Sequence, residues 1–65
     1  MTNGQLYNNT DEQLYQIHLP YAVFGIIVRN GIVAESAPIG NWMIGKSITF
    51  IQSWVNRKGG TIMTV

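Results

Sequence analysis

Residues 40 to 47, with the sequence GNWMIGKS, fit the pattern G-x-x-x-x-G-K-[ST] at every position. In nucleotide hydrolases this pattern forms a loop whose backbone N–H groups surround phosphates. Its Lys contacts the terminal phosphates and its Ser or Thr binds Mg²⁺, roles that would fall here to Lys46 and Ser47. This stretch therefore indicates phosphate binding, which could be accompanied by hydrolysis of a nucleotide.

The surroundings of this octapeptide disfavour hydrolysis. The strand expected before it belongs to an antiparallel hairpin, and no later apolar strand ends in Asp to support a Mg²⁺ ion. The variable positions hold Trp, Met and Ile, which are large side chains for a loop that must wrap tightly round phosphate. A chain of 65 residues is also far shorter than such a hydrolase domain.

Catalytic and metal-binding side chains are scarce along the whole sequence. The chain has no Cys, a single His at position 18 and three acids, which are Asp11, Glu12 and Glu35. A zinc site needs several Cys, His or carboxylate ligands, and acid–base catalysis needs paired titratable groups. We therefore expect no enzyme activity, no metal and no cofactor, and we interpret His18 as an ordinary strand residue.

A weaker form of phosphate binding stays open. Free N–H groups at a helix start, the helix dipole and one Lys can hold an anion on any fold. The alternative is structural: Gly45 makes a turn, Ser47 caps the helix and Lys46 is solvated. The predicted ligand-binding residues are Asn41, Trp42, Gly45, Lys46, Ser47 and Arg57.

The segments that must position this loop predict a small α+β domain. Residues 1–13 are polar and predict a flexible tail, and residues 14–65 predict a single domain. Strands are expected at 14–19, 21–29, 32–37 and 61–65, a loop at 38–46, and a helix at 48–58 that Gly59 and Gly60 end. The fold class expected is a small antiparallel sheet, a β-hairpin plus flanking strands, with one helix packed on it in the order β-β-β-α-β. Pro20 places the strand at 14–19 at a sheet edge or kinks it.

The Asn-Gly pair at residues 30–31 predicts a two-residue type I′ turn, because both turn positions need a positive φ. The resulting register places Glu35 opposite Ile26. If that face is covered, Glu35 needs a cation such as Arg29, Lys46 or Arg57, and otherwise it reaches water at an edge. One face of the hairpin carries Phe24, Ile26, Val28, Val33 and Ala37, and the other carries Val23, Ile27, Ile32 and Ala34. One helix covers only one face, so we expect a second copy of the chain on the other.

The composition also favours contact with a partner. Apolar residues make up 46% of the chain and charged residues 11%, against roughly 25% charged residues in an average soluble protein. Trp and Met are enriched at interface cores, although Trp42 and Met43 could instead fold back on the domain's own core. The predicted interface residues are Trp42, Met43, Val23, Ile27 and Ile32. No apolar run is long enough to span a bilayer and the first residues lack a signal-peptide pattern, so we expect a cytoplasmic homo-oligomer.

The stretch PYAVFGIIVRNGIVAESAPIGNWMIGKS, followed by a helix with Trp and then KGGTI, resembles a type of small uncharacterised accessory protein that bacteriophages encode. The resemblance covers residues 20–65. It implies a setting rather than a mechanism, because such proteins commonly act by binding. It implies a non-enzymatic protein that binds a host factor, or that sequesters a phosphate-containing signal such as a cyclic dinucleotide and so counteracts host defence.

Two alternatives remain open. One is a structural component of the virion. The other is a small nucleic-acid-binding module that would use sheet aromatics together with Arg29, Lys46, Arg57 and Lys58. The net charge of +1 gives little attraction to nucleic acid, which makes this the second choice of partner.

Overall fold

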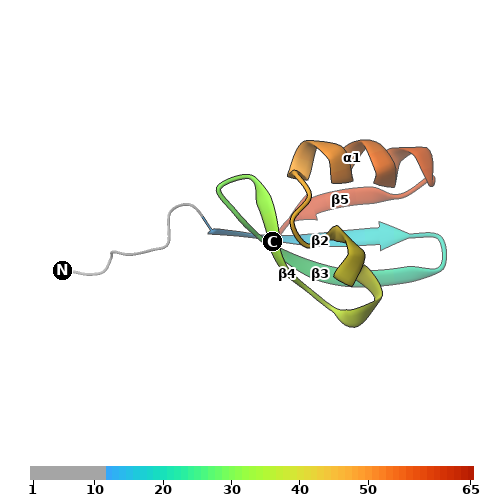
Figure 1. Ribbon diagram of the computed structural model, residues 1–65. Coiled ribbons are helices and arrows are strands. Elements are labelled where there is room, and N and C mark those ends of the chain that lie inside the picture. The colour runs from blue at the N-terminus through green and yellow to red at the C-terminus, as the bar shows by residue number, and fades with distance from the viewer. Residues whose placement is uncertain (1–11) are drawn as a thin grey trace.

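The computed structural model describes residues 12–65 as a four-stranded antiparallel sheet with one α-helix against one face (Figure 1). The strand order is β4-β3-β2-β5. The elements are β2 (Glu12–Leu19), β3 (Ala22–Arg29), β4 (Ile32–Ser36), the 3-10 helix η1 (Pro38–Met43), α1 (Ile48–Arg57) and β5 (Thr61–Thr64). This arrangement confirms the predicted α+β class, with a small antiparallel sheet and one helix.

The first strand begins earlier than the sequence predicts. Glu12 and Gln13, expected in a tail at residues 1–13, belong to β2 and pair with β3. The rest of that predicted tail, residues 1–11, lies outside the described residues. Of the two alternatives for Pro20, the edge position of this strand is wrong, because β2 lies between β3 and β5. Pro20 follows the last residue of β2, so its missing N–H removes no bond from the sheet.

The hairpin of β3 and β4 turns where the sequence predicts. Asn30 and Gly31 have φ values of 55° and 78°, the two positive angles that a type I′ turn needs. Asn is one of the residues that tolerate this region, and Gly has no Cβ to oppose it. The turn therefore follows from local backbone preferences alone.

The register that follows the turn shifts at Ala34, an extra residue that forms a β-bulge. Glu35 consequently opposes Ile27, and the predicted pairing of Glu35 with Ile26 is wrong. The shift turns Glu35 away from the covered face, where its carboxylate would be costly to bury, to the face that α1 leaves uncovered. There Glu35 is exposed and accepts a hydrogen bond from Arg29, one of its three predicted partners.

The core lies between the sheet and the layer formed by α1 and η1. Residues 38–46 were expected to be a loop, but Pro38–Met43 form a 3-10 helix that carries Met43 into the core. The buried apolar residues are Ile17, Leu19, Phe24, Ile26, Val28, Val33, Met43, Ile51 and Val55. Ile48 and Trp54 of α1 pack against this cluster.

Both ends of α1 follow local signals. Ser47 is the N-cap, and its Oγ accepts a hydrogen bond of 3.1 Å from the Phe50 N–H. Gly59 has a φ of 81° and ends the helix after Arg57, with Lys58 as the C-cap. No helix within residues 12–65 combines the length and the apolar character needed to cross a bilayer.

Replacement of Ser47 by Ala is expected to lower the free energy of unfolding by about 1 kcal/mol, because the Phe50 N–H loses its acceptor. Chemical denaturation followed by circular dichroism measures the change. Ser53→Ala is the matched control, since Ser53 is exposed within the helix and Ala is a better helix former there. Equal effects of the two substitutions would contradict the capping role.

Candidate functional site

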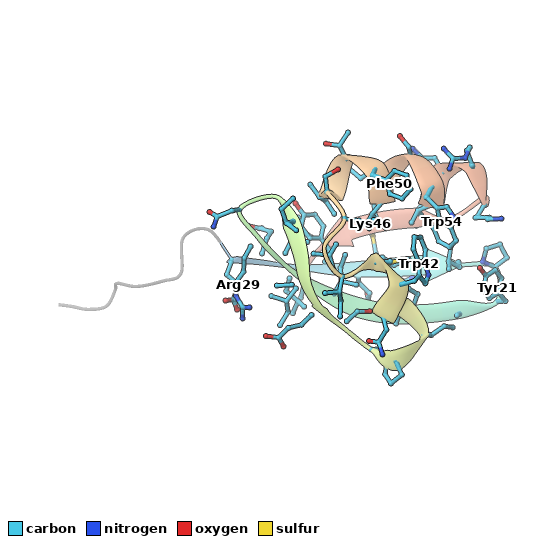
Figure 2. The ribbon with its side chains drawn as sticks, viewed as in Figure 1. Tyr21, Arg29, Trp42, Lys46, Phe50 and Trp54 are labelled. Atoms are coloured by element: carbon cyan, nitrogen blue, oxygen red, sulfur yellow. The ribbon has the colours of Figure 1, made fainter. Side chains whose placement is uncertain are left out.

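Five side chains at intervals of four residues form one surface on the helix side of the protein: Trp42, Lys46, Phe50, Trp54 and Lys58. We call this set the lysine–aromatic stripe. Residues four apart in a helix share a face, which brings Phe50, Trp54 and Lys58 together. Figure 2 shows Trp42 and Lys46 lying beside Phe50 and Trp54, although both precede the helix. The stripe therefore combines one helix face with the segment that leads into it.

The contacts within the stripe pair each lysine with an aromatic ring. Lys46 Nζ lies 5.9 Å from the centre of the Phe50 ring, and Lys58 Nζ lies 5.7 Å from that of Trp54. Both distances fall within the range of cation–π attraction. The rings of Trp42 and Trp54 meet edge to face, with their centres 4.8 Å apart. Trp42 and Phe50 remain 44% and 46% exposed, so aromatic surface beside a cation is open to a ligand.

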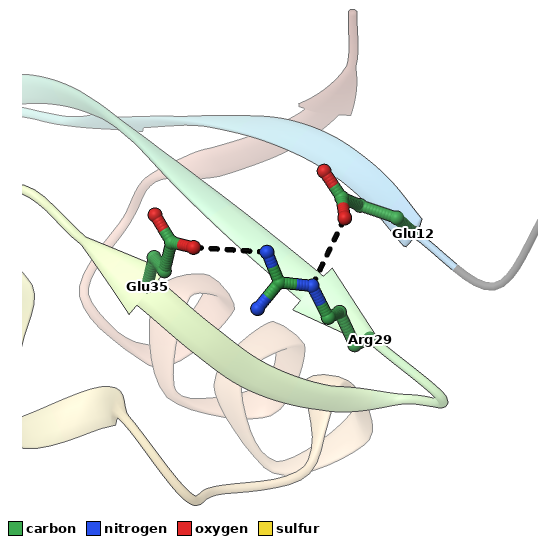
Figure 3. A network of polar contacts seen from close by, with 3 residues as sticks. All are labelled: Glu12, Arg29 and Glu35. Carbon is green, nitrogen blue, oxygen red and sulfur yellow. Dashed lines mark hydrogen bonds and ion pairs between the residues drawn. The ribbon is translucent and has the colours of Figure 1, made fainter. Parts of the chain in front are cut away.

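Charge is divided between the two sides of the molecule. Arg29 lies on the uncovered face of the sheet, where its Nε donates to Glu12 and its Nη2 donates to Glu35, each at 2.9 Å (Figure 3). The hydrogen bond to Glu12, followed by that to Glu35, raises the pKa of Arg29 above its ordinary value. These are the ion pairs formed within residues 12–65. Lys46 and Lys58 form none there, which leaves the stripe positively charged.

The backbone of GNWMIGKS serves the fold rather than a phosphate. The Gly45 N–H donates to the Val33 carbonyl at 2.8 Å, and the Lys46 N–H donates to the Met43 carbonyl at 2.9 Å. Just inside the helix, the Ile48 N–H donates to a carbonyl of the hairpin turn at 2.8 Å. A phosphate loop needs these donors free, because they form its cradle. Gly45 and Ser47, two predicted ligand residues, therefore act here as a turn and a helix cap.

Of the other predicted ligand residues, two lie in the lysine–aromatic stripe and two lie outside it. Trp42 and Lys46 meet in the stripe, while Arg57 is exposed in the last turn of α1. Asn41 is exposed on η1, where its carbonyl accepts a hydrogen bond from the Ile44 N–H. The lysine of the octapeptide thus contributes to a surface, and not to a loop that encloses a ligand.

Four of the five predicted interface residues reach the surface. Val23 and Ile32 are 57% and 43% exposed, Ile27 is half-buried, and Trp42 lies in the stripe. The prediction for Met43 is corrected: it is fully buried in the protein's own core, because η1 turns it inward. Trp42, the residue before it on the same short helix, points outward instead.

The side of the sheet opposite α1 is here called the open face. Its residues are Glu12, Leu14, Gln16, His18, Val23, Gly25, Ile27, Arg29, Ile32, Glu35, Thr61 and Met63. A shallow hollow lies at Gly25, which has no side chain, and Leu14, Ile27 and Glu35 line it. The imidazole of His18 lies 3.0 Å from the side-chain oxygen of Gln16. The open face is therefore a mixture of apolar and polar groups.

Phe50 and Trp54 were not predicted as members of a ligand site, and Lys58 was predicted only for the nucleic-acid-binding alternative. The repeat of four residues from position 42 to position 58 is visible in the sequence and could have indicated them. Of the aromatics suggested for nucleic acid, Phe24 is buried, Tyr15 packs against the core, and Tyr21 is 66% exposed in the turn between β2 and β3. Comparisons of the chain with protein families, with curated proteins and with solved structures find no match.

Proposed function

We propose that this protein is a non-enzymatic binding protein whose lysine–aromatic stripe holds a phosphate-bearing ligand that contains a nucleobase. The observation that carries the proposal is the pairing of each lysine with an aromatic ring: Lys46 lies 5.9 Å from exposed Phe50, and Lys58 lies 5.7 Å from partly buried Trp54. Aromatic side chains stack on bases, and each stacked base contributes about 1–3 kcal/mol. Lysines attract the phosphates of the same ligand, and neither lysine has a carboxylate partner within residues 12–65.

Binding of this kind provides a function without catalysis. A bacteriophage accessory protein that holds a nucleotide signal removes it from a host defence pathway, and sequestration needs only affinity. The same surface also suits a host protein as a target, because Ile39 and Ile44 are 52% and 46% exposed near Trp42 in the sequence. The positive charge of the stripe favours an anionic ligand over an apolar protein patch.

A short single strand of nucleic acid is the second candidate, and the length of the stripe supports it. The helix α1 has ten residues. At a rise of roughly 1.5 Å per residue such a helix is about 15 Å long, and Lys46 and Lys58 flank its two ends. Such a separation suits a ligand with two or more phosphates set apart, such as a cyclic dinucleotide or an oligonucleotide. If added salt steeply weakens the binding of oligonucleotides but not that of cyclic dinucleotides, the single strand is favoured as the ligand.

Replacement of Trp42 by Ala is expected to weaken ligand binding about tenfold, because the ring available for stacking is lost. The double substitution Lys46→Ala and Lys58→Ala is expected to weaken binding at least as much and to leave folding nearly unchanged, since both lysines are exposed. Titration of tryptophan fluorescence with mononucleotides, cyclic dinucleotides and oligothymidylate measures both effects. Native mass spectrometry of protein purified from bacterial cells shows any ligand retained.

Arg29→Gln is the matched control, because it removes one positive charge from the open face and none from the stripe. It is expected to leave affinity unchanged. Equal weakening by Arg29→Gln and by the lysine pair would mean that net charge, and not the stripe, attracts the ligand. The proposal fails if no nucleotide, cyclic oligonucleotide or single strand changes the fluorescence or the melting temperature.

Self-association is a second part of the proposed function. The domain is small, its chain has 11% charged residues, and apolar side chains such as Val23 and Met63 are half exposed on the open face. Small domains without disulfides commonly gain stability by association. Size-exclusion chromatography with light scattering over a range of concentrations tests this part separately from ligand binding.

A further inference from the structure

The two edges of the sheet differ in how their backbone groups are used. The outer edge of β4 is covered by the segment that leads into α1. The Val33 N–H donates to the Lys46 carbonyl at 2.9 Å, and the Gly45 N–H donates back to the Val33 carbonyl at 2.8 Å. The outer edge of β5 meets no other strand within residues 12–65, because β5 ends the strand order. Figure 3 views the open face and shows α1 behind the sheet.

The register of β5 on β2 decides which of its groups point outward. The Val65 N–H donates to the Leu14 carbonyl at 3.0 Å, so Val65 faces β2. In an antiparallel pair, successive residues alternate between facing the neighbouring strand and facing away. Met63 therefore also faces β2, while the N–H and C=O groups of Ile62 and Thr64 face outward. The free edge thus offers the N–H and C=O groups of Ile62 and Thr64, one residue on each side of Met63.

We propose that this edge pairs with the same edge of a second copy, antiparallel across a two-fold axis, and joins the two sheets into one. The proposal rests on the self-association part of the proposed function and names its surface. Ile62 pairs with Thr64 of the partner subunit, and Thr64 with the partner's Ile62. Two outward N–H groups on each copy make four hydrogen bonds, and Met63 lies on the axis against the partner's Met63.

The side chains of β5 suit a second copy. Residues 61–64 have the sequence TIMT and carry no charge, so no like charges meet across the axis. Natural proteins guard free edges with Lys, Pro or bulges, and β5 has none of these. A two-fold interface brings the same patch together from both copies, and outward groups placed symmetrically about Met63 satisfy one another in that geometry. The self-complementary register is the reason for choosing a second copy over an unrelated strand.

The open face is the competing surface, and its charges count against it. Two carboxylates, Glu12 and Glu35, share the single guanidinium of Arg29 there. Stacking two copies face to face would remove these groups from water and place an excess of negative charge between the sheets. Pairing at the β5 edge leaves all three groups hydrated.

Met63→Cys tests the pairing directly, because the chain contains no other Cys. Residues opposed in a non-hydrogen-bonded antiparallel pair have Cα atoms about 4.5 Å apart. A disulfide spans about 4.4–6.8 Å between Cα atoms. Mild oxidation is therefore expected to convert most of the Met63→Cys protein into a covalent dimer. Thr61→Cys is the matched control on the same strand and face, and it is expected to remain monomeric because it opposes the partner's Val65.

Thr64→Pro provides a second measurement that needs no oxidation. Proline removes the outward N–H of Thr64 and leaves the bonds between β5 and β2 in place. The dimer is expected to be lost in light scattering at concentrations where the unaltered chain is dimeric, with no change in the unfolding of the monomer. Thr64→Val, which keeps the N–H, is expected to retain the dimer.

Two results would overturn the proposal. A covalent dimer of Ile27→Cys but not of Met63→Cys would place the interface on the open face and keep self-association. A monomer at every concentration would remove both the edge pairing and self-association, while the fluorescence titration decides ligand binding independently.

Discussion

Replacement of Met43 by Ala is expected to unfold a large share of the protein at room temperature. Met43 has no exposed surface and belongs to the buried cluster beneath η1. Truncation of a buried Met to Ala costs about 2–5 kcal/mol, because transfer free energy is lost and a cavity remains. A core of this size rarely supplies more than about 3–5 kcal/mol of net stability. The cost of the substitution is therefore comparable with the whole stability of the domain.

Denaturation in urea, followed by tryptophan fluorescence and circular dichroism, measures this loss. Ile44→Ala is the matched control, because Ile44 follows Met43 in the chain but is 46% exposed. It is expected to change the free energy of unfolding by less than about 1 kcal/mol. Similar midpoints for the two variants would show that Met43 is not the anchor of η1.

Gly60→Ala is expected to have the second largest effect on stability. A methyl group at Gly60 would collide with the backbone carbonyl oxygen of His18 in β2. It would also lie 3.0 Å from Leu19 Cδ2 and 3.1 Å from Val55 Cγ1. A strand carbonyl cannot move aside without breaking its sheet bonds, so the link between α1 and β5 must shift. Overpacking of this kind costs about 1–3 kcal/mol, and contact with backbone places this substitution at the upper end.

Gly59→Asn separates the collision at Gly60 from the general loss of a glycine. Gly59 has a φ of 81° and open space where a side chain would begin. Asn tolerates this backbone region, so its cost is expected to be well below that of Gly60→Ala. Thermal unfolding of both variants measures the difference. A larger loss for Gly59→Asn would show that backbone conformation, and not close packing against β2, limits this connection.

Several elements could be predicted because their causes lie within a few residues. The turn at residues 30–31 depends on the φ preferences of Asn and Gly. The helix cap at Ser47 depends on a hydrogen bond from Phe50, three residues later in the chain. The end of the helix at Gly59 depends on one residue in the left-handed backbone region. The alternation of side chains along β3 likewise divided its residues correctly between the two faces, but it left open which face the helix covers. These features were predicted correctly, because neighbours in sequence are also neighbours in space.

Local sequence was thus enough to predict the fold class, the sites of the turn and the helix ends, and the scarcity of catalytic groups. Three further points depend on contacts between distant parts of the chain. The bulge at Ala34 depends on which face of the sheet α1 covers. The burial of Met43 depends on the path of η1 across the sheet. The contact between Trp42 and Trp54 depends on the placement of both α1 and η1. The octapeptide shows the same division: its pattern suits a phosphate, but its Gly45 N–H donates to Val33 of β4, a strand that lies more than ten residues earlier in the chain. Such contacts arise from burial and chain path, which no short stretch of sequence contains.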